Sequence, residues 1–358
     1  MSVCNTMSLA TDAANAGRAR RHRAPERRLS VAPMMDCTDP YARYLLRLIT
    51  RQALLYTEMV PAPAIVHGRL DLFLAFDPAE HPVAVQFGGA DPAELAICAR
   101  WAHRYGYDEV NLNVGCPSDR VQSGRFGACL MAEPQRVAEC VAAMAEASPL
   151  PVTVKTRIGI DDQDSWEALE DFVGTVSEGG GCDSFAIHAR KAWLQGLSPK
   201  QNREVPPLDY QRVYRLKQAF PGLEIIINGG ITDLEQAEQH LQAVDGVMIG
   251  REAYHNPYML AEVDRRLFGD DRPAPSRHDI LEAYLPFVET RLQAGAPLSA
   301  MSRHLLGLFQ GVPGARAWRR HISENAHRPG AGVEVLQEAA AKVGRPAEAE
   351  AATAPPGA

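Results

Sequence analysis

The chain has 358 residues, a length at which one hydrophobic core usually stops growing, so we expect a large domain and a smaller one. Its 46% hydrophobic and 23% charged residues match an ordinary soluble protein, and the lack of a long uninterrupted apolar run excludes a membrane helix. The net charge of −7 is unfavourable for a protein that binds nucleic acid over its whole surface.

The first 28 residues are rich in arginine and contain no apolar stretch, which excludes a secretory signal. We expect residues 1–28 to form a disordered basic leader; an organellar transit peptide is the alternative. The seven cysteines are odd in number, scattered, and without a Cys-x-x-Cys pair. This pattern argues against a disulfide framework and a zinc site, so we expect no metal and a reducing compartment, the cytoplasm.

From residue 30 onward, eight short β-branched runs alternate with Ala-rich segments of helical composition, which often begin with Asp-Pro or Thr-Asp. Nearly continuous apolar runs are typical of parallel strands covered on both faces. Eight βα units predict an α/β fold, a TIM (β/α)8 barrel; a doubly wound open sheet is the competing arrangement. The predicted strands are 30–34, 54–60, 83–87, 109–114, 152–158, 184–188, 224–228 and 246–249.

A small all-α C-terminal domain is predicted after the barrel. The stretch 267–275 has the Gly, Asp and Pro content of a linker, and the segments that follow it look helical with no strand between them. The last residues are a low-complexity mixture of Ala, Glu and Pro, which is typical of a disordered tail. The predicted domains are a barrel at 29–266, a helical domain at 276–343 with helices at 279–294, 299–309 and 314–325, and a tail at 344–358.

The chemistry of TIM barrels sits at the carboxyl ends of the strands. The seventh predicted strand ends at Asn228, Gly229 and Gly230, and the eighth ends at Gly250 and Arg251. Glycines let backbone N–H groups approach a phosphate closely, and Arg251 adds a charged fork, so these loops predict a phosphate site. The alternative is that both turns simply need glycine.

Lys155 and Arg157 lie in an apolar strand, where a cation must be paired or bind an anion. A lysine beside the N1/C2 edge of a flavin would stabilise its anionic reduced form; a structural ion pair is the alternative. Gln86 and His188 lie at two other strand ends, where each alone could be a hydrogen-bonded core residue. Together with the phosphate loops, these side chains suit an isoalloxazine site.

The segment 110–118 is the strongest single feature of the chain. It places Asn111 and Asn113 on an apolar strand that ends at Cys116. Buried amides cost free energy unless they bind something, and the thiol on the following turn is placed to meet the same ligand. The segment therefore predicts one wall of an active site.

The motifs along the chain resemble those of the tRNA-dihydrouridine synthases, and two further stretches resemble the A-type subfamily of that family. The resemblance runs from about residue 28 to about residue 340, with its motifs in order. The family motifs are 32–36 (Ala-Pro-Met-Met-Asp), 113–118 (Asn-Val-Gly-Cys-Pro-Ser), 127–131, 154–159, 188–190 and 228–231, and the subfamily stretches are 191–203 and 303–311.

The resemblance implies an FMN enzyme that reduces uridine in the tRNA D-loop, at positions 20 and 20a, at the expense of NADPH. It implies that Cys116 is the proton donor and that Asn113 touches the uracil. A thiol suits this role because it is mostly protonated at neutral pH and gives up its proton readily. The residues expected to bind FMN are Pro33, Met34, Met35, Gln86, Lys155, Arg157, His188, Asn228, Gly229, Gly230, Gly250 and Arg251.

Two basic regions are candidates for contact with tRNA. Residues 301–328 contain five arginines and one glutamate, which favours a surface that follows phosphates, with Trp318 able to stack or pack. The loop after the sixth strand adds further polar and basic residues; ordinary solvated surfaces are the alternative. The residues expected to contact tRNA are Arg190, Lys200, Asn202, Arg203, Arg316 and Arg319.

No Gly-x-Gly-x-x-Gly motif follows a predicted strand, so we expect no separate dinucleotide domain and reduction of the flavin by NADPH in the open site. The chain shows no sign of an obligate protein partner, and we expect a monomer. Two alternative functions remain: a flavin barrel that acts on a free pyrimidine, as dihydroorotate dehydrogenases do, and a non-catalytic RNA-binding barrel.

Overall fold

The structure, a computed structural model, describes residues 24–118, 121 and 124–344. It divides into two compact units. The first contains the described residues up to Asp36 and the segment Ala53–Gly250, and the second contains Cys37–Gln52 and the described residues from Arg251 onward. Within the described ranges, no helix is both long and apolar enough to cross a membrane.

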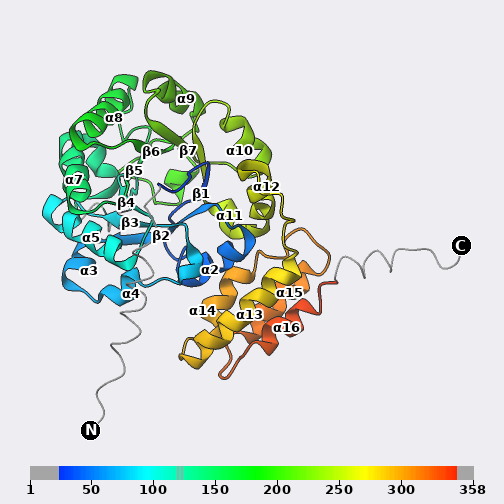
Figure 1. The fold of residues 1–358 in the computed structure, drawn as a ribbon. Helices are drawn as coiled ribbons and strands as arrows, with labels where there is room; N and C mark the ends of the chain where they lie inside the picture. Colours follow the sequence, from blue (N-terminus) through cyan, green and yellow to red (C-terminus); the bar gives the residue numbers. More distant parts are fainter. Residues whose placement is uncertain (1–23, 119–120, 122–123, 345–358) are drawn as a thin grey trace, which may run out of the picture. The chain divides into compact units, whose positions relative to one another are not determined.

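The first unit is a closed barrel of eight parallel strands in sequential order (Figure 1). The barrel closes because β1 pairs with β8, with Leu29 opposite Val247. This arrangement confirms the predicted TIM barrel and excludes the open sheet. The strands are β1 (Leu29–Val31), β2 (Leu54–Pro61), β3 (Val83–Gly88), β4 (Glu109–Asn113), β5 (Val152–Arg157), β6 (Ser184–His188), β7 (Glu224–Asn228) and β8 (Gly246–Ile249).

The helices around the barrel begin and end at sequence signals. Asp91 caps α5 by accepting hydrogen bonds from two backbone N–H groups, and Pro92 occupies the first turn, where no N–H is needed. Ser165 caps α8 in the same way. The helices of this unit are α3 (Ala62–His67), α4 (Leu70–Leu74), α5 (Pro92–Tyr105), α7 (Pro134–Ala147), α8 (Trp166–Gly180), α9 (Tyr210–Ala219) and α10 (Leu234–His240).

The barrel contains both buried polar side chains and a buried apolar cluster. Successive side chains of a strand point to opposite faces, so residues two apart line the same face. On β4 these are Glu109, Asn111 and Asn113, all buried and hydrogen-bonded to neighbouring strands. A buried apolar cluster accompanies them and consists of Ala32, Leu54, Tyr56, Ala84, Ala186, Ile226 and Met248.

Arg27 lies at the amino-terminal end of the barrel, although the sequence analysis placed it in the leader. Its guanidinium pairs with Glu109 at 2.6 Å and with Glu224 at 2.9 Å, and its side chain is 7% exposed. Burial alone would lower the pKa of Arg27, but the two carboxylates raise it above its usual value. Arg27 therefore belongs to the barrel and not to the predicted leader. Residues 1–23 of that leader, and the predicted tail from 345, lie outside the described residues.

The second unit is helical (Figure 1). Its helices after the barrel include α13, which begins at a capping box formed by Ser276 and Asp279. The helix α15 ends at Asn325, as predicted. The helices of the unit are α2 (Pro40–Ile49), α11 (Arg251–His255), α12 (Val263–Phe268), α13 (Arg277–Gln293), α14 (Leu298–Ser302), α15 (Ala315–Asn325) and α16 (Glu334–Ala340).

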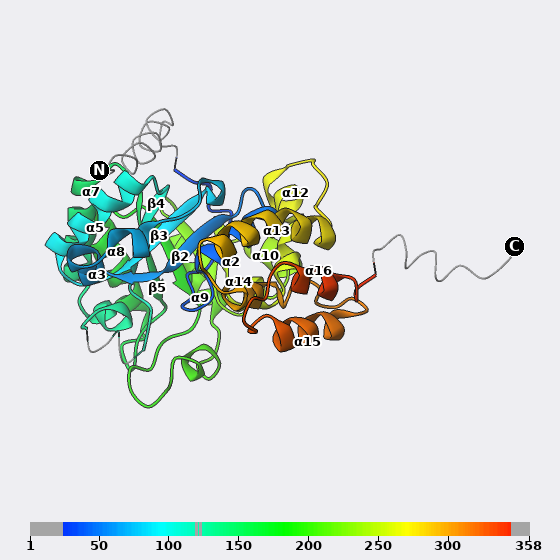
Figure 2. The ribbon, with the colours of Figure 1, turned by 90° about the horizontal axis from the view of Figure 1, so that it is seen from below.

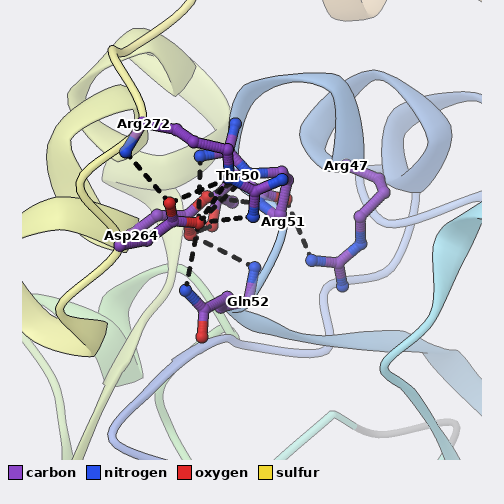
Figure 3. A network of polar contacts seen from close by, with 7 residues as sticks. Arg47, Thr50, Arg51, Gln52, Asp264 and Arg272 are labelled. Atoms are coloured by element: carbon purple, nitrogen blue, oxygen red, sulfur yellow. Dashed lines mark hydrogen bonds and ion pairs between the residues drawn. The ribbon is translucent and has the colours of Figure 1, made fainter.

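The segment that includes α2 is joined to the rest of the second unit by Asp264 (Figure 3). The Asp264 carboxylate accepts from the Thr50 hydroxyl at 2.6 Å, from the Arg51 backbone N–H at 2.7 Å and from the Gln52 backbone N–H at 3.2 Å. These bonds satisfy two backbone N–H donors in the segment just past the end of α2, where no regular structure supplies them with acceptors. A residue more than 200 positions away in sequence therefore fixes this segment.

Candidate active site

Cys116 lies in a turn directly after β4, at the carboxyl end of the barrel. Figure 2 shows the connections after β4 and β6 on the same side of the strands. The Asn113 side-chain oxygen accepts from the backbone N–H groups of Gly115 at 3.1 Å and of Cys116 at 3.0 Å. Such an Asx turn holds the backbone in place of a regular ladder. The Cys116 thiol is half-buried, with Ser118 Oγ at 3.5 Å.

The backbone of this turn is also held from outside. The Cys116 carbonyl accepts from the Ala128 N–H at 2.9 Å, and a Cβ at Gly127 would lie 2.6 Å from the same carbonyl oxygen. Gly127 has φ +77°, a conformation that favours glycine, so the residue is required for both reasons. Arg157 Nε donates to the Gly115 carbonyl at 2.7 Å from the other side. The thiol is therefore presented by a rigid turn.

Two cations lie on β5 next to this turn. Lys155 Nζ donates to Asn228 Oδ1 at 3.0 Å, so β5 and β7 meet through these side chains. Burial, together with the charge of Arg157, lowers the pKa of Lys155 to about 7. Burial also lowers the pKa of Arg157 to about 10. The described groups around Lys155 thus leave its ammonium without a full counter-charge, which suits an anionic or electron-rich ligand.

The guanidinium of Arg157 is directed at backbone carbonyls. Besides Gly115, it donates to Lys191 at 3.2 Å and to Asn202 at 3.3 Å. The side chain is buried, and its contacts join the Cys116 turn to the loop after β6. This geometry suits a residue that positions loops, and the contact of Arg157 with a cofactor stays a prediction.

His188 ends β6 as a neutral donor. Its Nδ1 accepts from the Arg190 backbone N–H at 3.2 Å, so its proton is carried on Nε2. Burial, followed by the charges of Arg157 and Lys155, lowers the pKa of His188 well below its usual value. The Nε2–H is therefore available to donate to a ligand at the strand end.

The loop after β7 needs glycine for its own geometry. Gly230 has φ +73°, and a Cβ there would lie 2.6 Å from Leu208 Cδ1. The Tyr210 hydroxyl fixes the loop by donating to the Gly229 carbonyl at 2.8 Å. The turn-forming alternative is therefore sufficient for Gly230, and the sequence analysis missed the supporting role of Tyr210.

Gly250 at the end of β8 is different. A Cβ at this position would meet only Ala32 and Met34, each at 3.9 Å, an ordinary van der Waals distance. The protein therefore has room for a side chain at Gly250, and the glycine leaves a space beside the first-strand loop. Such a space is what a phosphate group would need. The next residue, Arg251, is exposed at the start of α11.

The first-strand loop carries Pro33, Met34 and Met35. Pro33 and Met34 are partly accessible, whereas Met35 is 56% exposed, which is unusual for a large apolar side chain. Exposed soft side chains at a strand end can pack on a planar ligand. Met35 is therefore not a core residue, and its contact with FMN stays a prediction.

Gln86 and Asn111 bond mainly to one another and to their neighbours. Gln86 donates to Asn111 Oδ1 at 2.8 Å and accepts from Asn113 Nδ2 at 2.8 Å. Asn111 in turn donates to Thr153 Oγ1 at 2.8 Å. The buried Asn111 amide has the partners that burial requires, but these are Gln86 and Thr153 of the protein itself and not a ligand. Thr153 was not predicted from the sequence, and the alternation of residues on β4 is the signal that could have indicated such a network.

The loop after β6 brings basic side chains to the same end of the barrel. Lys200 and Arg203 are exposed, and Arg190 donates to the Pro206 carbonyl. Asn202 is fully buried, donates to the Trp193 carbonyl at 2.9 Å and accepts from the Trp193 N–H at 2.8 Å. The prediction that Asn202 contacts tRNA is therefore corrected, because its side chain is used inside the loop.

The second unit contains a hollow of about 1050 Å³ lined in part by Arg303, Arg316 and Arg319. Arg316 is exposed and Arg319 is partly exposed on the first turns of α15. Trp318 is fully buried, and its Nε1–H donates to the Leu305 carbonyl at 3.0 Å, so it packs inside the unit instead of stacking on a base. In the part of the chain that the structure describes, no three His, Cys, Asp or Glu side chains gather as metal ligands would.

Comparison with known proteins decides the family. The model of the family described as "Dihydrouridine synthase (Dus)" matches residues 30–343. The chain belongs to the dihydrouridine synthase family. This finding confirms the resemblance and the enzyme class expected from the sequence, and it sets aside the two alternative functions.

Similar proteins extend over nearly the whole chain. A tRNA-dihydrouridine(20/20a) synthase of Vibrio vulnificus is 65% identical over 316 residues, which is 88% of this chain and 97% of that protein. One of Yersinia pestis is 60% identical over 89% of this chain and 92% of that protein. Among solved structures, a 2-naphthoyl-CoA reductase has a TM-score of 0.50 at 10% identity over 66% of this chain and 49% of that chain, a likeness of fold alone.

Proposed function

We propose that this chain is an FMN-dependent synthase that reduces uridine to 5,6-dihydrouridine at positions 20 and 20a of the tRNA D-loop, with NADPH as reductant. The observation that carries the proposal is the Cys116 thiol, half-buried on a rigid turn at the same barrel end as Lys155 and His188. The named relatives at 60–65% identity support the substrate and the positions.

The residues at the barrel end fit a flavin. Lys155 would face the N1/C2 edge, where a cation stabilises the reduced anion, and the His188 Nε2–H would donate to the ring or its side chain. Gln86 and the methionines of the first loop would border the ring. Asn228 would hold Lys155 in place, since its amide already joins Lys155 to the Met248 carbonyl, 2.7 Å away.

The phosphate of FMN would lie at the ends of β7 and β8. Gly229 and Gly230 would offer backbone N–H groups, and the space at Gly250 would admit the phosphate oxygens. The guanidinium of Arg251 would add a charged donor. Arg157 would act indirectly, by fixing the Cys116 turn and the loop after β6.

Bound flavin supplies the hydride that uracil C6 accepts. The chain's own residues then complete the reduction, because the Cys116 thiol donates the proton that C5 of the ring requires. The Asn113 side-chain oxygen accepts from the N–H groups of the turn, and one of its N–H groups donates to Gln86. Its second N–H would therefore donate to a uracil carbonyl. Because Ala128 and Arg157 hold the backbone of the turn, the thiol would keep a fixed position relative to the base.

Two basic surfaces would hold the tRNA. Lys200 and Arg203 are exposed on the loop after β6, and Arg190 lies at the start of that loop. In the second unit, Arg316 and Arg319 line a hollow that suits the phosphate backbone. A D-loop base must leave its stack to reach the thiol, and contacts to the backbone offset that cost. We also propose that the enzyme acts as a monomer in the cytoplasm, in line with the six free thiols among the described residues.

The test uses the purified chain with FMN, NADPH and an unmodified tRNA transcript. We expect mass spectrometric mapping to find dihydrouridine at positions 20 and 20a, and transcripts with cytidine at these positions to remain unmodified. Free uracil and orotate serve as competing substrates, and their reduction in preference to tRNA would contradict the proposal. Mapping tRNA from a strain without the protein gives the corresponding result in cells.

A further inference from the structure

A line of hydrogen bonds runs through the barrel from the Cys116 turn to its opposite end. It passes from Cys116 N–H to Asn113 and on to Gln86 and Asn111, with distances of 3.0, 2.8 and 2.8 Å. From Asn111 it continues to Thr153 at 2.8 Å and ends on Glu109 Oε1 at 2.6 Å. The line connects three neighbouring strands, β3, β4 and β5.

The direction of this line is fixed at both ends. At the upper end, the backbone N–H groups of Gly115 and Cys116 can only donate, so the Asn113 oxygen must face them. At the lower end, the Glu109 carboxylate, which is paired with Arg27, accepts from the Thr153 hydroxyl, so this hydroxyl accepts in turn from the amide above. Each amide between them therefore has one orientation that satisfies its neighbours.

Burial makes these bonds hard to replace. Gln86, Asn111, Thr153 and Glu109 are each at most 3% exposed, and Asn113 is 8% exposed. A buried polar group that loses its partner cannot turn to bulk water, so a break at one point disturbs the next group along the line. The lower end is anchored further by Arg27, whose Nε donates to Glu109 Oε2 at 2.6 Å.

We propose that Thr153 and Glu109 are positioning residues for the Cys116 turn, although they lie near the other end of the barrel. Glu109 and Asn113 are four residues apart on β4, which corresponds to about 13 Å. The line of hydrogen bonds orients the Asn113 amide so that its oxygen accepts from the N–H groups of Gly115 and Cys116 and its remaining N–H faces the strand end. The proposal rests on the proposed function in assigning proton donation to Cys116.

Tyr56 offers a matched control. Its hydroxyl donates to the same Glu109 oxygen at 2.6 Å, and its side chain is 2% exposed, but it lies outside the line. Tyr56→Phe and Thr153→Val each remove one buried hydroxyl from Glu109 with little change in volume. A merely structural role of the Glu109 cluster predicts similar results for both variants, whereas positioning through the line predicts an effect of Thr153→Val alone.

The first measurement is backbone amide exchange of Gly115 and Cys116 in the flavin-free protein, resolved by mass spectrometry with fragmentation. We expect Thr153→Val to speed this exchange about tenfold, Thr153→Ser to restore the slow rate, and Tyr56→Phe to leave it unchanged despite a similar fall in Tm. Asn111→Leu, which removes an amide from the line, should give the same result as Thr153→Val. Unchanged exchange in Thr153→Val, or equal acceleration in Tyr56→Phe, would overturn the proposal.

The second measurement is reoxidation of pre-reduced flavin by tRNA in a single turnover. We expect Thr153→Val to lower the limiting rate about tenfold with the half-saturating tRNA concentration unchanged, and Tyr56→Phe to retain the wild-type rate. An equal loss in both variants would reject positioning. Failure of the wild-type chain to reduce tRNA would reject the proposed function instead, and the exchange experiment would still decide whether the line holds the turn.

Discussion

The backbone N–H of Cys116 donates to the side chain of Asn113, three residues earlier, at 3.0 Å. The residue proposed to touch the base and the residue proposed to protonate it are thus parts of one turn. A change at Asn113 should therefore alter the position of the thiol as well as the contact with uracil. Proton donation is therefore tested more cleanly by substituting Cys116 than by substituting Asn113.

Cys116→Ala should retain FMN and its reduction by NADPH but lose about 100-fold or more in uridine reduction, because the proton donor is gone while the turn is kept. Stopped-flow reduction of the flavin and its reoxidation by tRNA separate the two half-reactions. Cys129→Ala removes another partly accessible thiol after β4, and the reduced flavin of this variant should be reoxidised by tRNA at the wild-type rate. Unchanged uridine reduction by Cys116→Ala would show that another group donates the proton to C5.

FMN affinity should fall as the pH rises above about 7. The pKa of Lys155 is about 7 in the flavin-free site, and a bound flavin that favours the ammonium raises it, so binding takes up a proton above that pH. Below about pH 7 the lysine is charged in both states, and this contribution is constant. Fluorescence titration between about pH 7 and 9 should show affinity falling by up to about tenfold per pH unit.

Two controls isolate Lys155 in that titration. Lys155→Met should bind FMN more weakly and show no dependence of affinity on pH in this range. Riboflavin, which lacks the titratable phosphate, should show the same slope as FMN with the wild-type chain. A slope that persists in Lys155→Met would point to another group.

Gly250→Ala should fold normally and bind FMN at least about tenfold more weakly, because the added methyl group has room in the protein but occupies the proposed phosphate space. Riboflavin should lose little affinity in the same variant. Gly230→Ala is the contrasting substitution, since its φ of +73° and the 2.6 Å approach to Leu208 predict a lower Tm. If Gly250→Ala lost affinity for FMN and for riboflavin equally, the phosphate would not bind beside Gly250.

Arg316→Ala and Arg319→Ala should each weaken tRNA binding and reduce the slope of log K against log salt by about 1, with normal flavin content. Filter binding at several salt concentrations provides the slope. Arg136→Ala removes an exposed arginine of α7 that pairs with Glu139 at 3.0 Å, and it should leave the slope unchanged. If all three variants have the wild-type slope, the tRNA does not reach α15.

The periodic parts of the chain were predictable because buried parallel strands are short apolar runs with clear ends. Three strands, β6, β7 and β8, have the predicted bounds, whereas β1 ends at Val31, three residues before the predicted end. The expected helix at 299–309 is instead the short α14 followed by a 3-10 turn, Arg303–Leu305, and α16 was missed. Short helices carry too few apolar positions to show a period.

Long-range partners could not be predicted in this way. The grouping of α2 with the helical unit rests on long-range contacts such as those of Asp264 and the stacking of Tyr44 on Phe287, and no local pattern in residues 37–52 indicates them. The burial of Asn202 and the engagement of Gln86 by two asparagines depend on loop packing and on strand register. Residue type located the candidate site, but only the closed barrel shows which polar groups already have partners.

The ion pairs of Arg27 set the point at which shortening of the chain from its amino end becomes harmful. Removal of the residues before it spares both pairs. Removal of Arg27 as well would leave the Glu109 carboxylate at 0% exposure without its cation, at the foot of the hydrogen-bonded line. Shortening of the chain from its amino end should therefore stop before Arg27, two residues ahead of β1, although the sequence analysis placed this arginine in the basic leader.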